Sequence, residues 1–94
     1  MIEIEEFVYV KLPEIRKYLA LELRKRKITM LKVGEIMGVS KVAISQYVNN
    51  KRVNRELLTK KERVFLGKEA KELDNIEQFK KIVSKMLKGG NQTR

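Results

Sequence analysis

Residues 29–50 of this 94-residue chain read TMLKVGEIMGVSKVAISQYVNN, and their spacing predicts two short helices joined by a tight turn. Thr29 and Ser40 each precede a run with helical periodicity. Both suit the N-cap position, where a side-chain oxygen accepts a backbone N–H. Gly38 separates the two runs and suits the left-handed conformation that often ends a helix. We therefore expect one helix on each side of Gly38.

The same segment meets the demands of two helices, over about 30–37 and 41–50, that cross closely. A small residue is needed where the second helix crosses the first, and Gly34 supplies it. Val39 follows the turn and can fill the corner between the helices. Because these conditions are met in order, the segment favours a helix-turn-helix. The remaining inward positions are apolar, namely Val33, Met37, Ile44 and Val48.

An amphipathic helix is predicted before this segment, over about 13–26. Pro13 suits the first turn of that helix, where its missing N–H costs nothing. The run FVYV at 7–10 is rich in β-branched and aromatic residues. It can form a short N-terminal strand, an extended arm or a segment that packs before the helix. The apolar residues of the helix recur every four positions and are Ile15, Leu19 and Leu23.

Two further helices are predicted towards the C-terminus. Thr59 and Glu62 have the spacing of a capping box, which opens a helix. A last helix, over 74–88, should stop at Gly89-Gly90. We expect residues 1–94 to form a single all-α domain, a compact helical bundle that contains the helix-turn-helix.

Charge narrows the kind of partner. The chain has 22 Lys and Arg against 12 Asp and Glu, a net charge of +10. Residues 16–55 hold eleven basic and two acidic residues. A basic segment of this kind favours a polyanion, nucleic acid before an acidic membrane surface. The alternative is the solvated, Lys-rich surface of a heat-adapted protein. Likewise, the cations of 24–27 either cap the preceding helix or contact phosphates.

Composition also excludes several functions. With no His and no Cys, the chain has no imidazole base, thiolate nucleophile or ordinary zinc site. It also lacks a Gly-rich phosphate loop, so we expect no enzyme, no cofactor and no metal. No apolar run approaches the roughly 18 residues that cross a bilayer, and the acidic N-terminus is unlike a signal peptide. We therefore expect a cytoplasmic, nucleoid-associated protein without a membrane partner.

The residues from Gly34 to Val48, GEIMGVSKVAISQYV, resemble the helix-turn-helix of Cro- and repressor-like (XRE-type) regulators. Residues 7–23, FVYVKLPEIRKYLALEL, are similar to the lead-in of the archaeal branch of predicted regulators of this type. The similarity covers about half the chain, residues 7–52. Met30 stands where family members often have a Gln that contacts phosphate. The resemblance implies a sequence-specific regulator of transcription that binds double-stranded DNA, most simply a repressor on a pseudo-palindromic site.

The resemblance also implies that residues 41–50 are the recognition helix, which lies in the major groove. The chemistry of base edges suits Gln46 to adenine, Lys41 to guanine and Val42 to a thymine methyl group. Ser45 can donate to a base or to a phosphate. The first role expected of Ser40 is to cap the helix, and Tyr47 is as well suited to half-buried packing as to a phosphate contact. Candidate phosphate contacts, which position the protein, are Thr29, Ser40, Tyr47, Asn50, Lys51 and Arg52.

A homodimer is expected because a lone helix-turn-helix reads only a few base pairs, whereas a dimer spans two half-sites. The apolar stripe of the last helix is the first candidate interface, and Phe7–Val10 is the second. The stripe has another interpretation, which is packing against its own domain. Its residues are Leu73, Ile76, Phe79, Val83 and Met86.

Two other functions stay open. One is a DNA-coating or plasmid-partition protein with low sequence specificity. The other is a protein-interaction module, such as an antitoxin or a transcription adaptor. RNA binding is less suited, because the chain has only six aromatic residues to stack on bases and most have helical core spacing. No effector domain is evident, so no small-molecule effector is expected.

Overall fold

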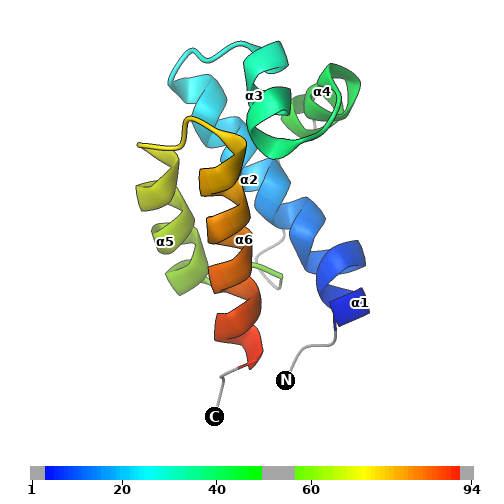
Figure 1. Cartoon of the computed structure of the whole chain (residues 1–94), viewed down its shortest axis with the longest axis vertical. Helices are drawn as coiled ribbons and strands as arrows, with labels where there is room; N and C mark the ends of the chain where they lie inside the picture. Colours follow the sequence, from blue (N-terminus) through cyan, green and yellow to red (C-terminus); the bar gives the residue numbers. More distant parts are fainter. Residues whose placement is uncertain (1–3, 50–56, 92–94) are drawn as a thin grey trace.

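The computed structural model describes residues 4–49 and 57–91, with side chains up to residue 88. All regular structure in these residues is helical, so the all-α class is confirmed. The elements are α1 (Ile4–Glu6), the π-helical turn η1 (Phe7–Lys11), α2 (Leu12–Lys25), α3 (Met30–Met37), α4 (Lys41–Asn49), α5 (Lys60–Ala70) and α6 (Ile76–Asn91) (Figure 1).

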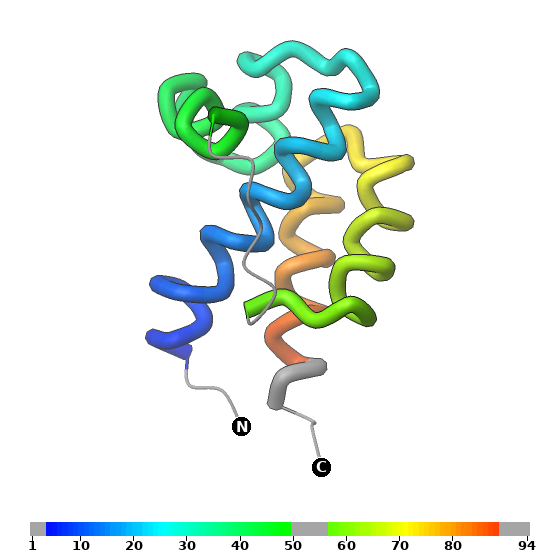
Figure 2. The backbone as a smooth tube through the Cα atoms, turned by 180° about the vertical axis from the view of Figure 1, so that it is seen from behind, coloured from blue at the N-terminus to red at the C-terminus, as the bar shows by residue number. Residues whose placement is uncertain are grey.

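The helices form an elongated bundle of 39 × 23 × 22 Å. α5 and α6 run antiparallel on one side of α2, and α3 and α4 lie across the end of the molecule that is farther from both termini (Figures 1 and 2). α2 packs against both α4 and α5, and α3 packs against α6. The α3–α4 pair therefore packs against two separate helices, α2 and α6.

A single apolar core joins these helices. The stripe predicted on α2 is confirmed, because Ile15, Leu19 and Leu23 are fully buried. α3 and α4 supply Ile36 and Ile44 to the same core. The described residues that α5 and α6 add are Leu66, Ala70, Phe79, Ile82 and Met86.

The helix starts predicted from local spacing are formed. Thr29 Oγ1 and Ser40 Oγ accept the backbone N–H three residues later, at 3.2 and 3.1 Å. Thr59 and Glu62 make both bonds of the capping box, at 3.2 and 3.0 Å. Gly38 ends α3 in the left-handed conformation, with φ +69°. These bonds satisfy N–H groups that the first helical turn leaves without partners.

Phe7–Val10 forms neither a strand nor an arm. It is part of a helix that starts at Ile4 and continues through η1 into α2. Pro13 therefore lies inside a long helix, where it has no N–H to donate and crowds the preceding turn. The spacing of the backbone hydrogen bonds increases in the turn before Pro13, where the N–H of Leu12 donates to the carbonyl of Phe7, five residues back. A π-turn of this kind accommodates a proline without ending the helix.

The expected stop of the last helix at Gly89-Gly90 is wrong, because α6 continues to Asn91. In the described part of the chain, Gly38 is the one glycine with a positive φ. Gly89 and Gly90 therefore keep the right-handed conformation. Glycine in a helix costs about 0.5–1 kcal/mol relative to alanine, which weakens a helix without ending it.

Polar contacts tie α2 to α5 at both ends. Lys11 forms an ion pair with Glu62 at the start of α5. At the other end, Arg26 Nη1 donates to the carbonyl oxygens of Ala70 and Leu73 at 2.7 and 2.9 Å. Ala70 is the last residue of α5 and Leu73 lies three residues beyond it, and the last carbonyls of a helix lack partners within that helix. Arg26 thus acts as a C-terminal cap supplied by another helix.

Candidate nucleic-acid interface

The turn between α3 and α4 lies directly against α3. The N–H of Val39 donates to the carbonyl of Gly34 at 2.9 Å. A Cβ on Gly34 would lie 2.6 Å from the carbonyl oxygen of Val39 and 3.7 Å from Ile44 Cγ1. Real Cβ atoms do not come that close to a backbone oxygen. The small residue predicted at this position is therefore required by the close approach of the turn.

The inward positions of α3 and α4 follow the prediction. Val33, Met37 and Ile44 are buried, and Val48 is half-buried against the core. Val39 is half-buried beside them and fills the corner of the turn. This packing fixes which face of α4 points outward.

The outward face of α4 begins at its first turn. Lys41, Val42 and Gln46 are exposed, Val42 to 69 %. Ser45 is half-buried, so it contributes less to the surface. Tyr47 is half-buried and packs against the core, as its packing interpretation predicted. The exposed part of α4 therefore combines a cation, an amide and an aliphatic side chain, and no carboxylate.

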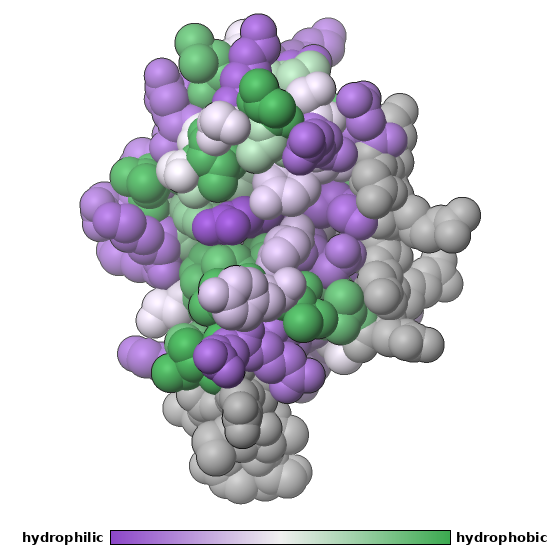
Figure 3. Space-filling view, turned by 90° about the vertical axis from the view of Figure 1, so that its right-hand side faces the viewer, coloured by the Kyte–Doolittle hydropathy of each residue, from purple (hydrophilic) through white to green (hydrophobic). Residues whose placement is uncertain are grey.

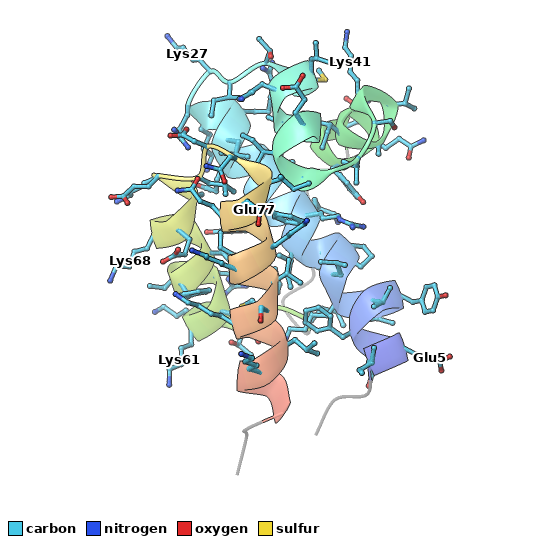
Figure 4. All side chains as sticks on the ribbon, in the orientation of Figure 1. Glu5, Lys27, Lys41, Lys61, Lys68 and Glu77 are labelled. Atoms are coloured by element: carbon cyan, nitrogen blue, oxygen red, sulfur yellow. The ribbon has the colours of Figure 1, made fainter. Side chains whose placement is uncertain are left out.

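Cations surround this face at the same end of the molecule. Figure 4 shows Lys41 and Lys27 pointing outward there, from α4 and from the α2–α3 loop. Lys32 and Thr29 are also exposed, at the start of α3. Lys32 was not among the residues selected from the sequence, whereas Lys27 was one of the four cations of 24–27 for which a phosphate contact was left open.

The remaining candidate phosphate contacts divide into two groups. Ser40 is exposed and its hydroxyl already caps α4, which leaves one lone pair and its own proton for a further contact. Asn50, Lys51 and Arg52 lie outside the described residues.

The cations of 24–27 are mostly engaged within the chain. Arg24 donates to the carbonyl of Ile28 at 2.7 Å, and Lys25 pairs with Glu22 at 3.1 Å. Arg26 caps α5. Lys27 has a positive φ of 66° and no ion pair to another described residue. None of these contacts reaches a terminal carbonyl of α2, so the capping of the preceding helix stays a prediction, and Lys25 and Lys27 are both exposed to solvent.

The apolar stripe of α6 packs on its own domain. Leu73, Phe79 and Met86 are buried within the core of the chain. Ile76 and Val83 are half-buried. The alternative interpretation, packing against the chain's own domain, therefore fits the three buried residues, whose surface is already covered within the chain.

Comparisons with known proteins identify no relative of this chain. No profile of a known family, no curated protein and no solved structure matches the chain. Across residues 4–49 and 57–91, no helix is both long and apolar enough to cross a membrane. Over the same residues, no three Asp or Glu side chains converge in a way that could hold a metal ion.

Proposed function

We propose that this chain binds double-stranded DNA through α3 and α4 and regulates transcription in a sequence-specific way, most simply as a repressor. α4 is then the recognition helix, and it lies in the major groove. The observation that best supports this proposal is the outward face of α4. Lys41, Val42 and Gln46 are exposed there, while Ile44 on the opposite face is buried in the core.

The chemistry of this face suits base edges. An exposed amide such as that of Gln46 can pair with adenine through two hydrogen bonds, and Lys41 can donate to guanine O6 and N7. Val42 offers an aliphatic surface to a thymine methyl group. A fixed helix face matters, because base contacts carry sequence information only when the side chains keep their register.

The surroundings of α4 suit the phosphates. Lys27, Lys32 and Thr29 present donors at the same end of the molecule, beside the first turn of α3. Glu35 is also exposed on α3 and opposes this attraction. The net charge of +10 outweighs one carboxylate and draws the protein towards DNA at long range.

A protein-interaction module is the second candidate function. Leu31 and Val42 are exposed aliphatic side chains on α3 and α4, 61 % and 69 % accessible. Exposed apolar surface of this kind suits a protein partner as well as thymine methyl groups. Charge reversal at Lys41 distinguishes the two, because it should abolish DNA binding and leave an apolar protein contact largely intact.

The experiment uses a duplex enriched from random sequences by the protein and a scrambled duplex of equal length. Fluorescence anisotropy at several salt concentrations gives both affinities. We expect a preference of about 10³-fold or more for the enriched duplex. Gln46→Ala should cost about 1–3 kcal/mol on the enriched duplex and little on the scrambled one. Lys27→Ala should weaken both equally and reduce the salt slope by about 1.

The outcomes separate the candidate functions. A steep salt slope without sequence preference would favour DNA coating over regulation. Equal losses from Gln46→Ala on both duplexes would show that α4 does not read bases. Lys68→Ala, on α5 at the side of the molecule (Figure 4), is the control for loss of charge alone.

A further inference from the structure

A groove of about 380 Å³ lies beneath the α3–α4 turn, between α2, the end of α3 and α6. This volume is within the range of pockets that hold small organic ligands. Figure 3 shows apolar side chains next to polar ones on the side of the molecule to the right in Figure 1. The polar groups of the groove are Arg16, Lys80 and Ser84. Its apolar walls include Leu12, Met37, Phe79 and Val83.

Arg16 is the unusual member of this lining. Its Nε is buried and has no hydrogen-bond partner in the described part of the chain. Leaving a buried donor unpaired costs about 1–3 kcal/mol, and more when the group is charged. An acceptor that enters the groove would remove this cost, so the site favours a ligand with an oxygen anion.

The remaining charges of the groove also favour an anion. No carboxylate lines it. Lys80 pairs with Glu77 at 3.8 Å, but both side chains are largely exposed, and such pairs contribute little. α3 ends at the groove, and its C-terminal carbonyls add at most about half a negative charge. Two cations exceed that partial charge, so the net potential is positive.

We propose that this groove binds a small carboxylate with an aliphatic body. Arg16 and Lys80 hold the carboxylate, and the apolar walls cover the aliphatic part. A guanidinium suits this ligand because it donates two parallel hydrogen bonds to one carboxylate. The aliphatic body contributes in proportion to the apolar area it removes from water.

The position of the groove links this ligand to α4. Gly38 forms part of the wall, and a Cβ on it would lie 3.1 Å from Ile76 Cδ1 of α6. The turn that orients α4 therefore rests closely on the helix that lines the groove. A bound carboxylate would shift this contact and change the DNA affinity. This regulatory consequence rests on the proposed function, whereas ligand binding itself does not.

The experiment titrates decanoate, below its micelle concentration, into the ¹³C-methyl-labelled full chain. We expect saturable shifts of the methyl resonances of Met37, Ile76 and Val83. Decanol, which has the same chain length and no charge, should bind at least about tenfold more weakly, as the loss of one charge-assisted contact implies. Arg16→Gln should remove this difference between the two ligands.

Two controls keep the result specific. Arg63→Gln, on α5 and outside the groove, should leave decanoate affinity unchanged. Lys80→Gln changes a largely exposed side chain and should lower decanoate affinity by a smaller factor than Arg16→Gln. Equal affinities for decanoate and decanol, or unchanged decanoate binding by Arg16→Gln, would overturn the proposal.

A second measurement repeats the DNA anisotropy at saturating decanoate. A changed affinity supports the regulatory role, and by linkage DNA must change the affinity for decanoate by the same factor. Unchanged DNA affinity with intact decanoate binding would overturn that role and leave the ligand site. Absence of any DNA binding would contradict the proposed function, and the methyl titration would still decide the ligand site.

Discussion

Gly34 is the residue at which one methyl group tests the packing of α3 against the turn. Gly34→Ala gains about 0.8–1 kcal/mol of helix propensity. It also places a Cβ 2.6 Å from a backbone oxygen, which cannot move without α4. Overpacking of this kind costs about 1–3 kcal/mol, so we expect a net loss of up to about 2 kcal/mol in the free energy of unfolding. Urea unfolding followed by circular dichroism measures it.

Gly67→Ala is the matched control, because Gly67 also lies inside a helix. The nearest atom to its Cβ would be the hydroxyl oxygen of Tyr18, at 3.3 Å. This is the end of a side chain and can move by a few tenths of an ångström. Burial, with Glu22 nearby, raises the pKa of Tyr18, so its hydroxyl stays neutral. Gly67→Ala should therefore be neutral or stabilising, and a loss equal to that of Gly34→Ala would contradict this account of the turn.

At the scale of helices, Arg26 joins the end of α2 to the end of α5. Arg26→Gln removes its bonds to two carbonyls and the 3.3 Å contact with Asp74. Hydrogen bonds from a charged donor contribute about 1.5–3 kcal/mol, and partial exposure reduces that value here. We expect a loss of about 1–2 kcal/mol in the free energy of unfolding. Lys27→Gln should leave stability unchanged, and equal losses would show that net charge, rather than the cap, stabilises α5.

The helix starts were predictable because a cap is a local device. Thr29, Ser40 and Thr59 each bond within three residues, so spacing alone identifies them. The π-turn at Phe7–Lys11 was not predictable, because the same β-branched run suits a strand. Only the continuous helical hydrogen bonding around Pro13 distinguishes a helix from a strand here. The role of Arg26 joins residues 44 and 47 positions apart, which periodicity does not reveal.

At the scale of the whole molecule, the sequence predicted the two helices of the candidate site better than it predicted the helices and the groove around them. The outward face of α4 follows from helical phase once Ile44 is placed in the core. The apolar stripe of α6 has the same periodicity whether it packs on its own domain or on a second copy. The pairing of Arg16 with an apolar groove depends on three helices meeting, and sequence spacing carries no information about that.

The assembly of the chain gives the last prediction. Phe7, the first residue of the second candidate interface, is buried in the core. Because the α6 stripe is also mostly buried, we propose that the exposed remainder of the second candidate, Val8–Val10, forms the homodimer. Exposed apolar side chains gather on the N-terminal turns: Ile4 and Val8–Val10, with Tyr9 exposed to 77 %. These turns lie at the edge of the bundle, away from α5 (Figures 1 and 2). Contiguous apolar surface of this kind indicates an interaction site.

Sedimentation equilibrium should therefore give a dimer for the unmodified chain at micromolar concentration. Tyr9→Lys should shift it to monomer, because a charge buried at an interface without a partner is strongly unfavourable. Val64→Lys is the control, since Val64 is an exposed aliphatic side chain on α5 and does not belong to the N-terminal turns. A monomer at high micromolar concentration would remove the dimer. An unchanged dimer in Tyr9→Lys would place the interface on another surface of the chain. The dimer could then bind two half-sites only if that other surface directs both α4 helices to the same face of the DNA.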